Sequence, residues 1–147
     1  MGLATRRAPH RFDGDAVQLA TDFCHELKMA GAGLSIWGGE STVRLPSNPG
    51  RGGRNQHLAL AAARLLVSHD ELTLLAAGSD GTDGPTSDAG AIVDSETIER
   101  GTLSGLDADT CLARADSGAF LEASGDLLHS GPTGTNVGDL VLGIKRV

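Results

Sequence analysis

Short apolar runs alternate along this chain with segments rich in glycine, and that alternation restricts its fold more than any other feature. Glycine accounts for 21 of the 147 residues, about twice its usual share, but the glycines follow no three-residue period. A collagen-like chain is therefore excluded, and the apolar runs argue against disorder. A chain of 147 residues has room for one domain with a single core, which must be aliphatic because aromatic residues make up only 3%.

Apolar residues recur at helical spacing in several parts of the chain. This pattern predicts helices over residues 15–30, 55–67, 95–104 and 108–123. Asp13 or Asp15 can cap the first of these helices, and Gly31 ends it. The second helix is rich in alanine and opens directly from the glycine-rich segment at 50–53. We therefore expect a helix N-terminus that follows a flexible loop.

The remaining apolar runs have the length of strands. Two short strands, at 33–37 and 43–45, are expected to be joined by a turn at 38–42. Residues 71–77 form an apolar run without alternation, which is typical of a central strand covered on both faces. Further strands are expected at residues 89–93, 127–129 and 140–147. This succession predicts an α/β domain, layered α/β/α, with a mixed and mainly buried sheet.

Charge and cysteine content exclude several classes of partner. The net charge of −7 repels a phosphate backbone, so we expect no nucleic-acid partner and no binding to an anionic membrane surface. No apolar run reaches the roughly 18 residues of a membrane span, and no apolar h-region follows the basic residues near the N-terminus, so we expect neither a transmembrane helix nor a signal peptide. Cys24 and Cys111 show no zinc-binding spacing, and we expect them to be buried thiols of a cytoplasmic protein.

Two aspartates follow the expected central strand, in the segment SDGTDGP at 79–85. In open α/β sheets ligands bind at the carboxyl ends of strands, which makes this loop a candidate site. Asp80 and Asp83, together with the Thr82 hydroxyl, could hold Mg²⁺, or one carboxylate could act as a general base. The alternative is an Asx turn that only shapes a tight loop, because Asp and Gly are common turn residues.

The segment GRGGRNQ places Arg51 and Arg54 at the start of the second expected helix. The helix dipole and the backbone N–H groups of Gly52, Gly53 and Asn55 favour an anion there. Each guanidinium can grip a carboxylate or phosphate through two parallel hydrogen bonds. The segment matches neither a Walker A loop nor the GxGxxG fingerprint, so no NAD site is expected. A glycine-rich turn with solvated arginines is the alternative.

Two further polar segments could contribute to a site. Glu40, in the GGEST segment, could orient Arg54 or lie exposed in a hairpin. The GPTGTN segment offers the hydroxyls of Thr133 and Thr135 and the amide of Asn136, which suit a hydroxylated or phosphorylated ligand. The histidines form no HxxxH pair and the GxSxG motif is absent, which argues against zinc and serine hydrolases.

Taken together and in order, the polar segments resemble those of one protein family. They are GGEST at 38–42, GRGGRNQ at 50–56, AAGSDGTDGPT at 76–86, AGAIVD at 89–94 and GPTGTNVGDL at 131–140. They resemble the MOFRL domain, the C-terminal domain of two-domain glycerate 2-kinases, which older naming labels hydroxypyruvate reductase. The resemblance covers residues 33–147. Residues 1–32 then correspond to an N-terminal segment with the helix that connects the two domains.

The resemblance implies ATP-dependent phosphorylation of D-glycerate to 2-phosphoglycerate, with Mg²⁺. The reaction would take place in a cleft between this domain and an N-terminal glycerate kinase domain, present in cis or in trans. The resemblance also implies that Arg54 holds a carboxylate or phosphate and that Asp80 and Asp83 position the metal or polarise the substrate hydroxyl. Further polar positions of the family motifs are matched by Glu40, Asn55, Thr82 and Asn136.

The sequence departs from the family pattern at a few positions. His57 stands where the family has glutamate, Ser87-Asp88 replaces Asp-Ala, and Gly138 replaces an asparagine. A larger departure is the missing N-terminal domain, which in the family supplies a catalytic lysine. Phosphoryl transfer depends on positioning and charge neutralisation from several sides, so we expect this chain alone to be inactive.

Other functions and assemblies are compatible with the sequence. A non-catalytic module that binds a small anion, such as glycerate or phosphate, would need only this half of the cleft. A hydroxypyruvate reductase is not supported, because the nicotinamide-binding fingerprint is missing from the sequence. A homodimer is compatible as well, because a face that lacks its partner domain exposes apolar residues.

Overall fold

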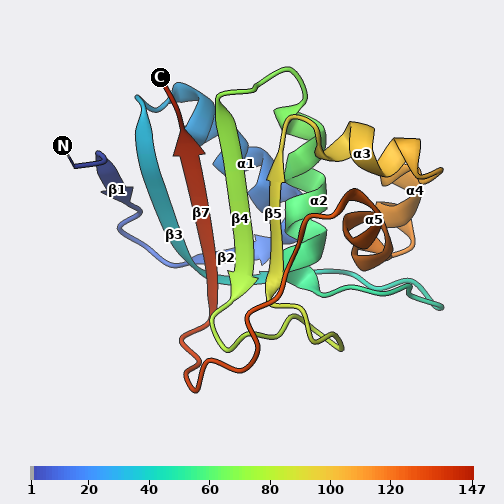
Figure 1. The fold of residues 1–147 in the computed structure, drawn as a ribbon. Coiled ribbons are helices and arrows are strands. Elements are labelled where there is room, and N and C mark those ends of the chain that lie inside the picture. The colour runs from blue at the N-terminus through green and yellow to red at the C-terminus, as the bar shows by residue number, and fades with distance from the viewer. Residues whose placement is uncertain (1) are drawn as a thin grey trace.

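The computed structural model describes residues 2–147, and Figure 1 shows a mixed sheet with helices behind and beside it. Its strands are β1 (Thr5–Arg7), β2 (Phe12–Asp15), β3 (Gly33–Thr42), β4 (Leu72–Gly78), β5 (Gly90–Asp94), β6 (Leu127–Leu128) and β7 (Asp139–Lys145). The order is β1-β3-β7-β4-β5-β6, with β2 also paired to β3. β1 and β2 run parallel to β3, and the other neighbours are antiparallel. The expected α/β class with a mixed sheet is confirmed.

The last strand along the chain, β7, lies in the middle of the sheet between β3 and β4 (Figure 1). At one end of β7, Asp139 is paired with Gly39 of β3 and with Gly78 of β4. The loop before β7, the loop after β4 and the last residues of β3 therefore meet at this end of the sheet. Polar segments that are far apart in the sequence become neighbours here.

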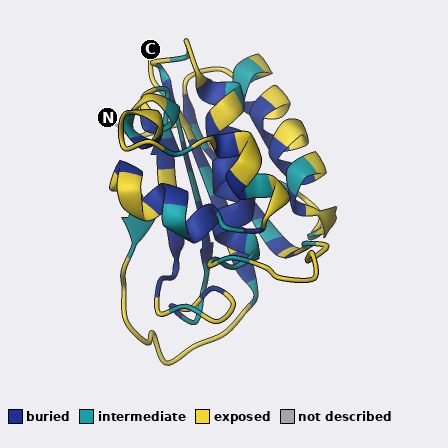
Figure 2. Cartoon of the chain, turned by 90° about the vertical axis from the view of Figure 1, so that its right-hand side faces the viewer, coloured by how far each residue is buried: buried dark blue, intermediate teal, exposed yellow. Residues whose placement is uncertain are grey.

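The helices are α1 (Ala16–Met29), α2 (Arg54–Leu66), α3 (Thr97–Leu103), α4 (Ala108–Ala113) and α5 (Ser117–Ser124). α1 and α2 pack against each other on one face of the sheet, and α3, α4 and α5 pack beside α2. Figure 2 shows that the helices bury their inner sides, and Leu58, Leu60 and Leu66 of α2 are fully buried. No helix described between residues 2 and 147 is long and apolar enough to cross a membrane.

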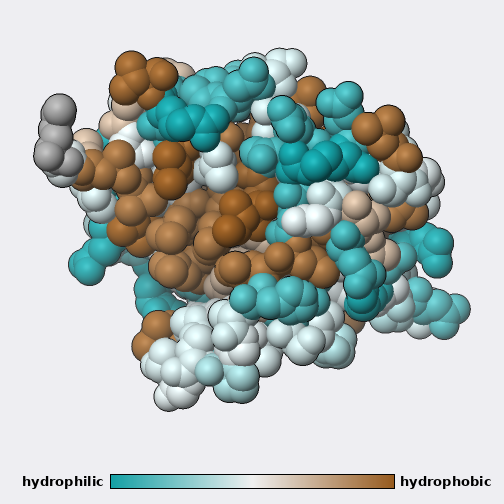
Figure 3. Space-filling model, viewed as in Figure 1, coloured by the Kyte–Doolittle hydropathy of each residue, from teal (hydrophilic) through white to brown (hydrophobic). Residues whose placement is uncertain are grey.

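The opposite face of the sheet is covered by no helix of residues 2–147. Apolar side chains gather on this face, as Figure 3 shows, and Ile92, Leu140 and Ile144 are 42%, 37% and 38% exposed. Of the two helical layers expected from the sequence, one is therefore present in the described residues. The apolar run of β4 points Leu74 into the core and Leu75 toward this open face, where it is half-buried.

The N-terminal segment and β3 differ from expectation. β3 runs unbroken through residues 33–42, where the sequence pattern predicts a strand followed by a turn. β1 and β2, which the pattern does not predict, pair along the outer edge of β3. Gly39 makes this close pairing possible, because a Cβ there would overlap the backbone carbonyl of Phe12. β1 and β2 thus belong to the same sheet as the strands of residues 33–147, and α1 contributes to the same hydrophobic core.

Residues 108–123 contain two helices, α4 and α5, in place of the single helix that the apolar pattern predicts. Between them Ala115 adopts a left-handed conformation with φ of 51°. The glycine-rich segment before α2 stabilises this break between the two helices. The Gly50 N–H donates to the Arg114 carbonyl at 2.8 Å, and the Arg51 N–H donates to the Asp116 carboxylate at 2.8 Å. Contacts remote in sequence therefore decide where this helix breaks.

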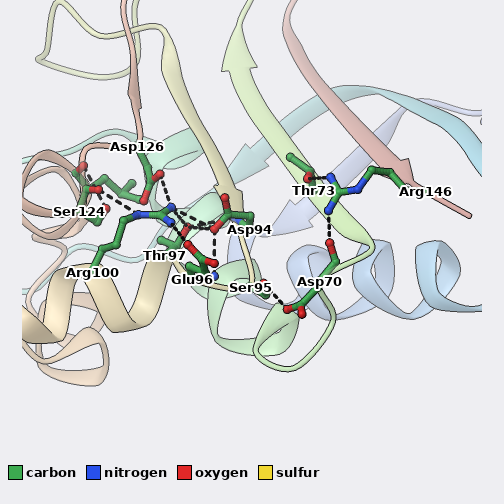
Figure 4. A network of polar contacts seen from close by, with 11 residues as sticks. Asp70, Thr73, Asp94, Ser95, Glu96, Thr97, Arg100, Ser124, Asp126 and Arg146 are labelled. Atoms are coloured by element: carbon green, nitrogen blue, oxygen red, sulfur yellow. Dashed lines mark hydrogen bonds and ion pairs between the residues drawn. The ribbon is translucent and has the colours of Figure 1, made fainter.

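A polar network ties the strands to the helices at the other end of the sheet, away from Asp139 (Figure 4). Arg100 of α3 donates to the Asp94 carboxylate at 3.0 Å and to the Asp126 carboxylate at 2.7 Å. Its Nε also donates to the Ser124 carbonyl at 3.2 Å. These contacts fasten α3 to the end of β5 and to the start of β6, so the network has a structural role.

The N-terminus of α2 is capped by a residue that is distant in sequence. Its N-cap residue, Gly53, has no side chain, and the buried carboxylate of Asp83 takes over the cap. Asp83 Oδ1 accepts from the Asn55 backbone N–H at 3.0 Å and from Asn55 Nδ2 at 3.1 Å, and Oδ2 accepts from the Gln56 N–H at 2.8 Å. Glycine is required at position 53 because a Cβ would overlap this carboxyl group.

Replacing Asp83 with asparagine is expected to lower the free energy of unfolding by about 1–3 kcal/mol, because an amide N–H₂ would then face the backbone N–H of Gln56. Chemical denaturation monitored by circular dichroism measures the change. Asp80→Asn is the matched control, since the asparagine oxygen can still accept from Thr82, and a change within about 0.5 kcal/mol is expected. Equal stability of the two variants would contradict the capping role of Asp83.

Candidate functional site

A cavity of about 440 Å³ lies at the end of the sheet where Asp139 begins β7. Its walls come from the end of β3, the start of α2, the loop after β4 and the loop before β7. The cavity brings together most of the residues that the sequence predicts for a site. These are Gly52, Gly53, Arg54, Asn55, Asp80, Thr82, Asp83 and Asn136.

Arg54 is held between two carboxylates at this cavity. Its Nε lies 3.0 Å from Asp139 Oδ2 and its Nη2 lies 3.3 Å from Asp139 Oδ1, while Nη1 lies 3.0 Å from Glu40 Oε1. The hydrogen bond that Arg54 donates to Asp139 raises the pKa of Arg54, which therefore stays charged. The predicted role of Glu40 in orienting Arg54 agrees with this geometry. A guanidinium carries five N–H donors, so donors remain free for a ligand.

Asp139 is a site residue that sequence reasoning missed. It is buried at the start of β7, and its carboxylate lines the cavity. The sequence contains one signal that could have identified it, because an acidic residue begins an apolar strand directly after a glycine-rich loop. Its partner, Arg54, lies far away in the sequence, and only the central position of β7 brings the two together.

The two aspartates of the loop after β4 have different surroundings. Asp83 is 2% exposed, both of its oxygens accept hydrogen bonds from α2, and burial raises its pKa. Asp80 forms the Asx turn that was the alternative expectation, since its Oδ1 accepts from the N–H and the hydroxyl of Thr82 at 3.0 and 3.1 Å. The second oxygen of Asp80 has no hydrogen-bond partner within residues 2–147. Asp80 is therefore the aspartate of this loop that is available to a ligand.

A Mg²⁺ site built from both aspartates does not fit this geometry. The oxygens of Asp83 already face N–H donors, and a metal ion there would have to displace the α2 cap. Among residues 2–147, no group of three or more His, Cys, Asp and Glu side chains is arranged to hold a metal ion. This chain can thus offer a metal the free oxygen of Asp80, but not a complete set of ligands.

Four residues that the sequence predicts as binding residues lie outside the cavity wall. They are Glu40, which reaches the site through its ion pair with Arg54, and Arg51, Thr133 and Thr135. Arg51 faces α5, where its Nη2 lies 2.7 Å from Glu122 Oε2 and 3.0 Å from the Gly118 carbonyl. Thr133 and Thr135 belong to the loop before β7, and the Thr133 hydroxyl donates to the Ser79 carbonyl at 2.6 Å. Arg51 therefore positions the segment before α2, and Thr133 fastens two loops to each other.

The charge of the site is dominated by carboxylates. Arg54 is the only lysine or arginine among the residues that line the cavity, which also include Asp80, Asp83 and Asp139. Glu40 adds a further carboxylate where it pairs with Arg54. A small anion that approaches Arg54 therefore meets a negative surrounding field, and additional positive charge is needed to bind it well.

The cavity also contains a polar wall, of which sequence reasoning predicted Asn55 but not Ser41 or His57. Ser41 Oγ, Asn55 Oδ1 and His57 Nδ1 are buried and have no hydrogen-bond partner in the described structure. All three residues line the cavity. Burial lowers the pKa of His57, so its imidazole is neutral near pH 7. These atoms thus lack the hydrogen bonds that buried polar atoms normally make.

Comparison with known proteins identifies relatives of this chain. The MOFRL family model matches residues 33–139. A D-glycerate 2-kinase of Thermotoga maritima is 50% identical over 109 residues, which cover 74% of this chain and 26% of that protein. A glycerate 2-kinase of Pyrococcus horikoshii is 43% identical, with 74% and 24% covered, and a Homo sapiens glycerate kinase is 46% identical, with 69% and 21% covered. The chain thus spans about a quarter of the length of these relatives.

Solved structures extend the likeness to the N-terminal segment. The crystal structure of a glycerate kinase from Thermotoga maritima superposes with a TM-score of 0.93 at 38% identity, covering 99% of this chain and 37% of that chain. A protein from Pyrococcus horikoshii superposes with a TM-score of 0.91 at 32% identity, covering 98% and 35%. Because the family model matches well over half of the residues, the chain belongs to the MOFRL family.

Proposed function

We propose that this chain forms one wall of the active site of a glycerate kinase, which transfers a phosphoryl group from ATP to D-glycerate and yields 2-phosphoglycerate. The observation that carries the proposal is Arg54, which is fixed by Glu40 and Asp139 with free N–H donors at a cavity of about 440 Å³. The proposal is further supported by the names of the relatives, since those similar to this chain include several glycerate kinases.

Arg54 would bind an oxygen of the glycerate carboxylate or of the transferred phosphoryl group. Two carboxylates that hold one guanidinium fix its orientation before substrate arrives, and such preorganisation lowers the cost of binding. Asp80, with its free carboxylate oxygen, would lie near the substrate hydroxyl or near the Mg²⁺ that accompanies ATP. Asp83 would act by holding the start of α2, and therefore Arg54, in place.

We propose that turnover requires a second domain. One guanidinium at the cavity is outnumbered by carboxylates, whereas phosphoryl transfer develops negative charge that must be neutralised. The missing positive charge would come from Mg²⁺ and from cationic residues of a partner domain, in the same chain or in another. The same excess of carboxylates disfavours the alternative of a stand-alone module for small anions. We retain a cytoplasmic location as part of this proposal.

The partner domain would cover the open face of the sheet. This face exposes Leu140, Ile144 and Ile92, and exposed apolar patches commonly mark interfaces. It is continuous with the site, because the Glu40 side chain projects from the open side of β3 and pairs with Arg54. The solved glycerate kinase of Thermotoga maritima is long enough to supply the partner, since this chain covers only 37% of it.

A reconstituted enzyme tests the proposed role of Arg54. The chain is fused to the remaining part of the Thermotoga maritima D-glycerate 2-kinase, and ADP formation from ATP and D-glycerate is measured with Mg²⁺ present. Arg54→Lys keeps the charge but loses the planar fork, and we expect kcat/KM to fall about 10- to 100-fold. The unfused chain is expected to form no ADP.

Arg64→Lys is the control variant, since Arg64 pairs with Asp109 outside the cavity and the lysine retains its charge. Its kcat/KM should stay within about twofold of the parent fusion, which is roughly the effect of a surface substitution. The proposal fails if Arg54→Lys is as active as Arg64→Lys, or if a folded fusion forms no ADP with D-glycerate.

The open face is tested by placing charges on it. Leu140→Asp is expected to weaken the association of this chain with the separately expressed partner domain by about tenfold or more, because a buried carboxylate would lack a partner. Isothermal titration measures the association, and Leu103→Asp is the control because Leu103 is exposed on α3. If sedimentation instead shows a dimer of this chain that Leu140→Asp dissociates, the face belongs to a homodimer and the assignment to the partner domain is wrong.

A further inference from the structure

We infer that Ser41, Asn55 and His57 form a neutral subsite of the cavity that binds an uncharged hydroxyl group of the ligand. The inference deepens the proposed function, on which it rests for the identity of the ligand as a hydroxy acid. These three side chains would bind the hydroxyl-bearing part of that ligand, and the Arg54 guanidinium would bind its charged part.

The subsite is indicated by polar atoms that are buried without a partner. Ser41 is 1% exposed, Asn55 is 1% exposed and His57 is 8% exposed. Ser41 Oγ, Asn55 Oδ1 and His57 Nδ1 make no hydrogen bond within residues 2–147, although buried polar atoms are almost always hydrogen-bonded. All three side chains line the same cavity as Arg54. A molecule that enters this part of the cavity can therefore supply partners that the described residues do not.

The chemistry of Asn55 restricts the ligand. Its Nδ2 donates to the Asp83 carboxylate at 3.1 Å, which fixes the amide so that Oδ1 is the unpaired atom. That atom is a pure acceptor, so the ligand must bring a donor. An ionised carboxylate or a fully ionised phosphate has none, whereas a hydroxyl both donates and accepts. The Ser41 hydroxyl can fill either role opposite the same ligand group.

His57 keeps the subsite neutral. Burial is the main cause that lowers its pKa, with a smaller contribution from Arg64 in the same direction, and Asp15 opposes both. A neutral imidazole offers one donor and one acceptor nitrogen, as a hydroxyl group requires. The subsite therefore adds hydrogen-bonding capacity to the cavity without changing the balance between Arg54 and its carboxylates.

The position of the subsite fits a small hydroxy acid. Ser41 directly follows Glu40 in β3, and Asn55 directly follows Arg54 in α2, so the ion pair and the subsite come from the same two segments. Neighbouring residues of a strand point to opposite faces, so Ser41 lies on the buried side of β3 and Glu40 on its exposed side, and a ligand would have to extend from Arg54 to the buried side to reach both. The cavity of about 440 Å³ accommodates a three-carbon acid.

Nuclear magnetic resonance of the chain fused to the remaining part of the Thermotoga maritima D-glycerate 2-kinase, labelled with ¹⁵N-histidine and ¹⁵N-arginine, tests the inference with three probes. Glycerol is neutral and hydroxylated, acetate is charged without a hydroxyl, and D-glycerate has both features. We expect glycerol and D-glycerate to shift the ring nitrogens of His57, and acetate and D-glycerate to shift Nε of Arg54. The internal controls are the rings of His10, His25, His69 and His129, none of which lines the cavity.

Ser41→Ala and His57→Phe are then expected to weaken glycerol binding at least fivefold and to leave acetate binding unchanged. Shifts at Arg54 with acetate, together with no response of His57 to glycerol or D-glycerate, would overturn the subsite and leave the proposed acid site intact. Shifts at His57 with glycerol and none at Arg54 with either acid would support the subsite and count against the proposed function. Unchanged glycerol affinity in folded Ser41→Ala and His57→Phe would also overturn the subsite.

Discussion

The buried carboxylate of Asp83 at the start of α2 is the contact on which the site depends. It satisfies backbone N–H groups that a helix N-terminus leaves without a partner, and the helix dipole in turn stabilises its negative charge. The contact joins the loop after β4 to the segment that carries Arg54 and Asn55. Asp83, which the sequence suggested as a catalytic residue, therefore stabilises the wall of the cavity. The nearby Asp80 keeps one carboxylate oxygen free.

The central position of β7 is the second constraint. It places Asp139 between the ends of β3 and β4, where Glu40 and Arg54 also lie, so that one guanidinium is fixed by two carboxylates. The same arrangement leaves the cavity with more negative than positive charge. One face of the sheet stays open and apolar next to it. The charge imbalance and the uncovered face both support the proposal that another part of a larger enzyme completes the site.

Local sequence patterns predicted the helices and strands well where the residues of an element are sufficient to determine its structure. The amphipathic pattern of α1, the alanine-rich run of α2 and the apolar run of β4 were all predicted close to their observed bounds. Prediction failed where a distant segment decides the outcome. β1 and β2 are short and polar and exist because β3 offers them an edge, and the break between α4 and α5 is held by hydrogen bonds from Gly50 and Arg51.

By itself, the sequence determined the α/β class, the helix that opens from a glycine-rich loop, the candidate residues Arg54, Asp80 and Asp83, and the resemblance to the MOFRL family. These depend on local propensity and on ordered motifs, which a linear chain displays directly. The tertiary structure alone decided that Asp83 caps α2, that Asp139 holds Arg54, and that Ser41 and His57 share a cavity. Those roles depend on which distant segments become neighbours. The order in which the strands pair decides this, when the sheet packs one face against α1 and α2.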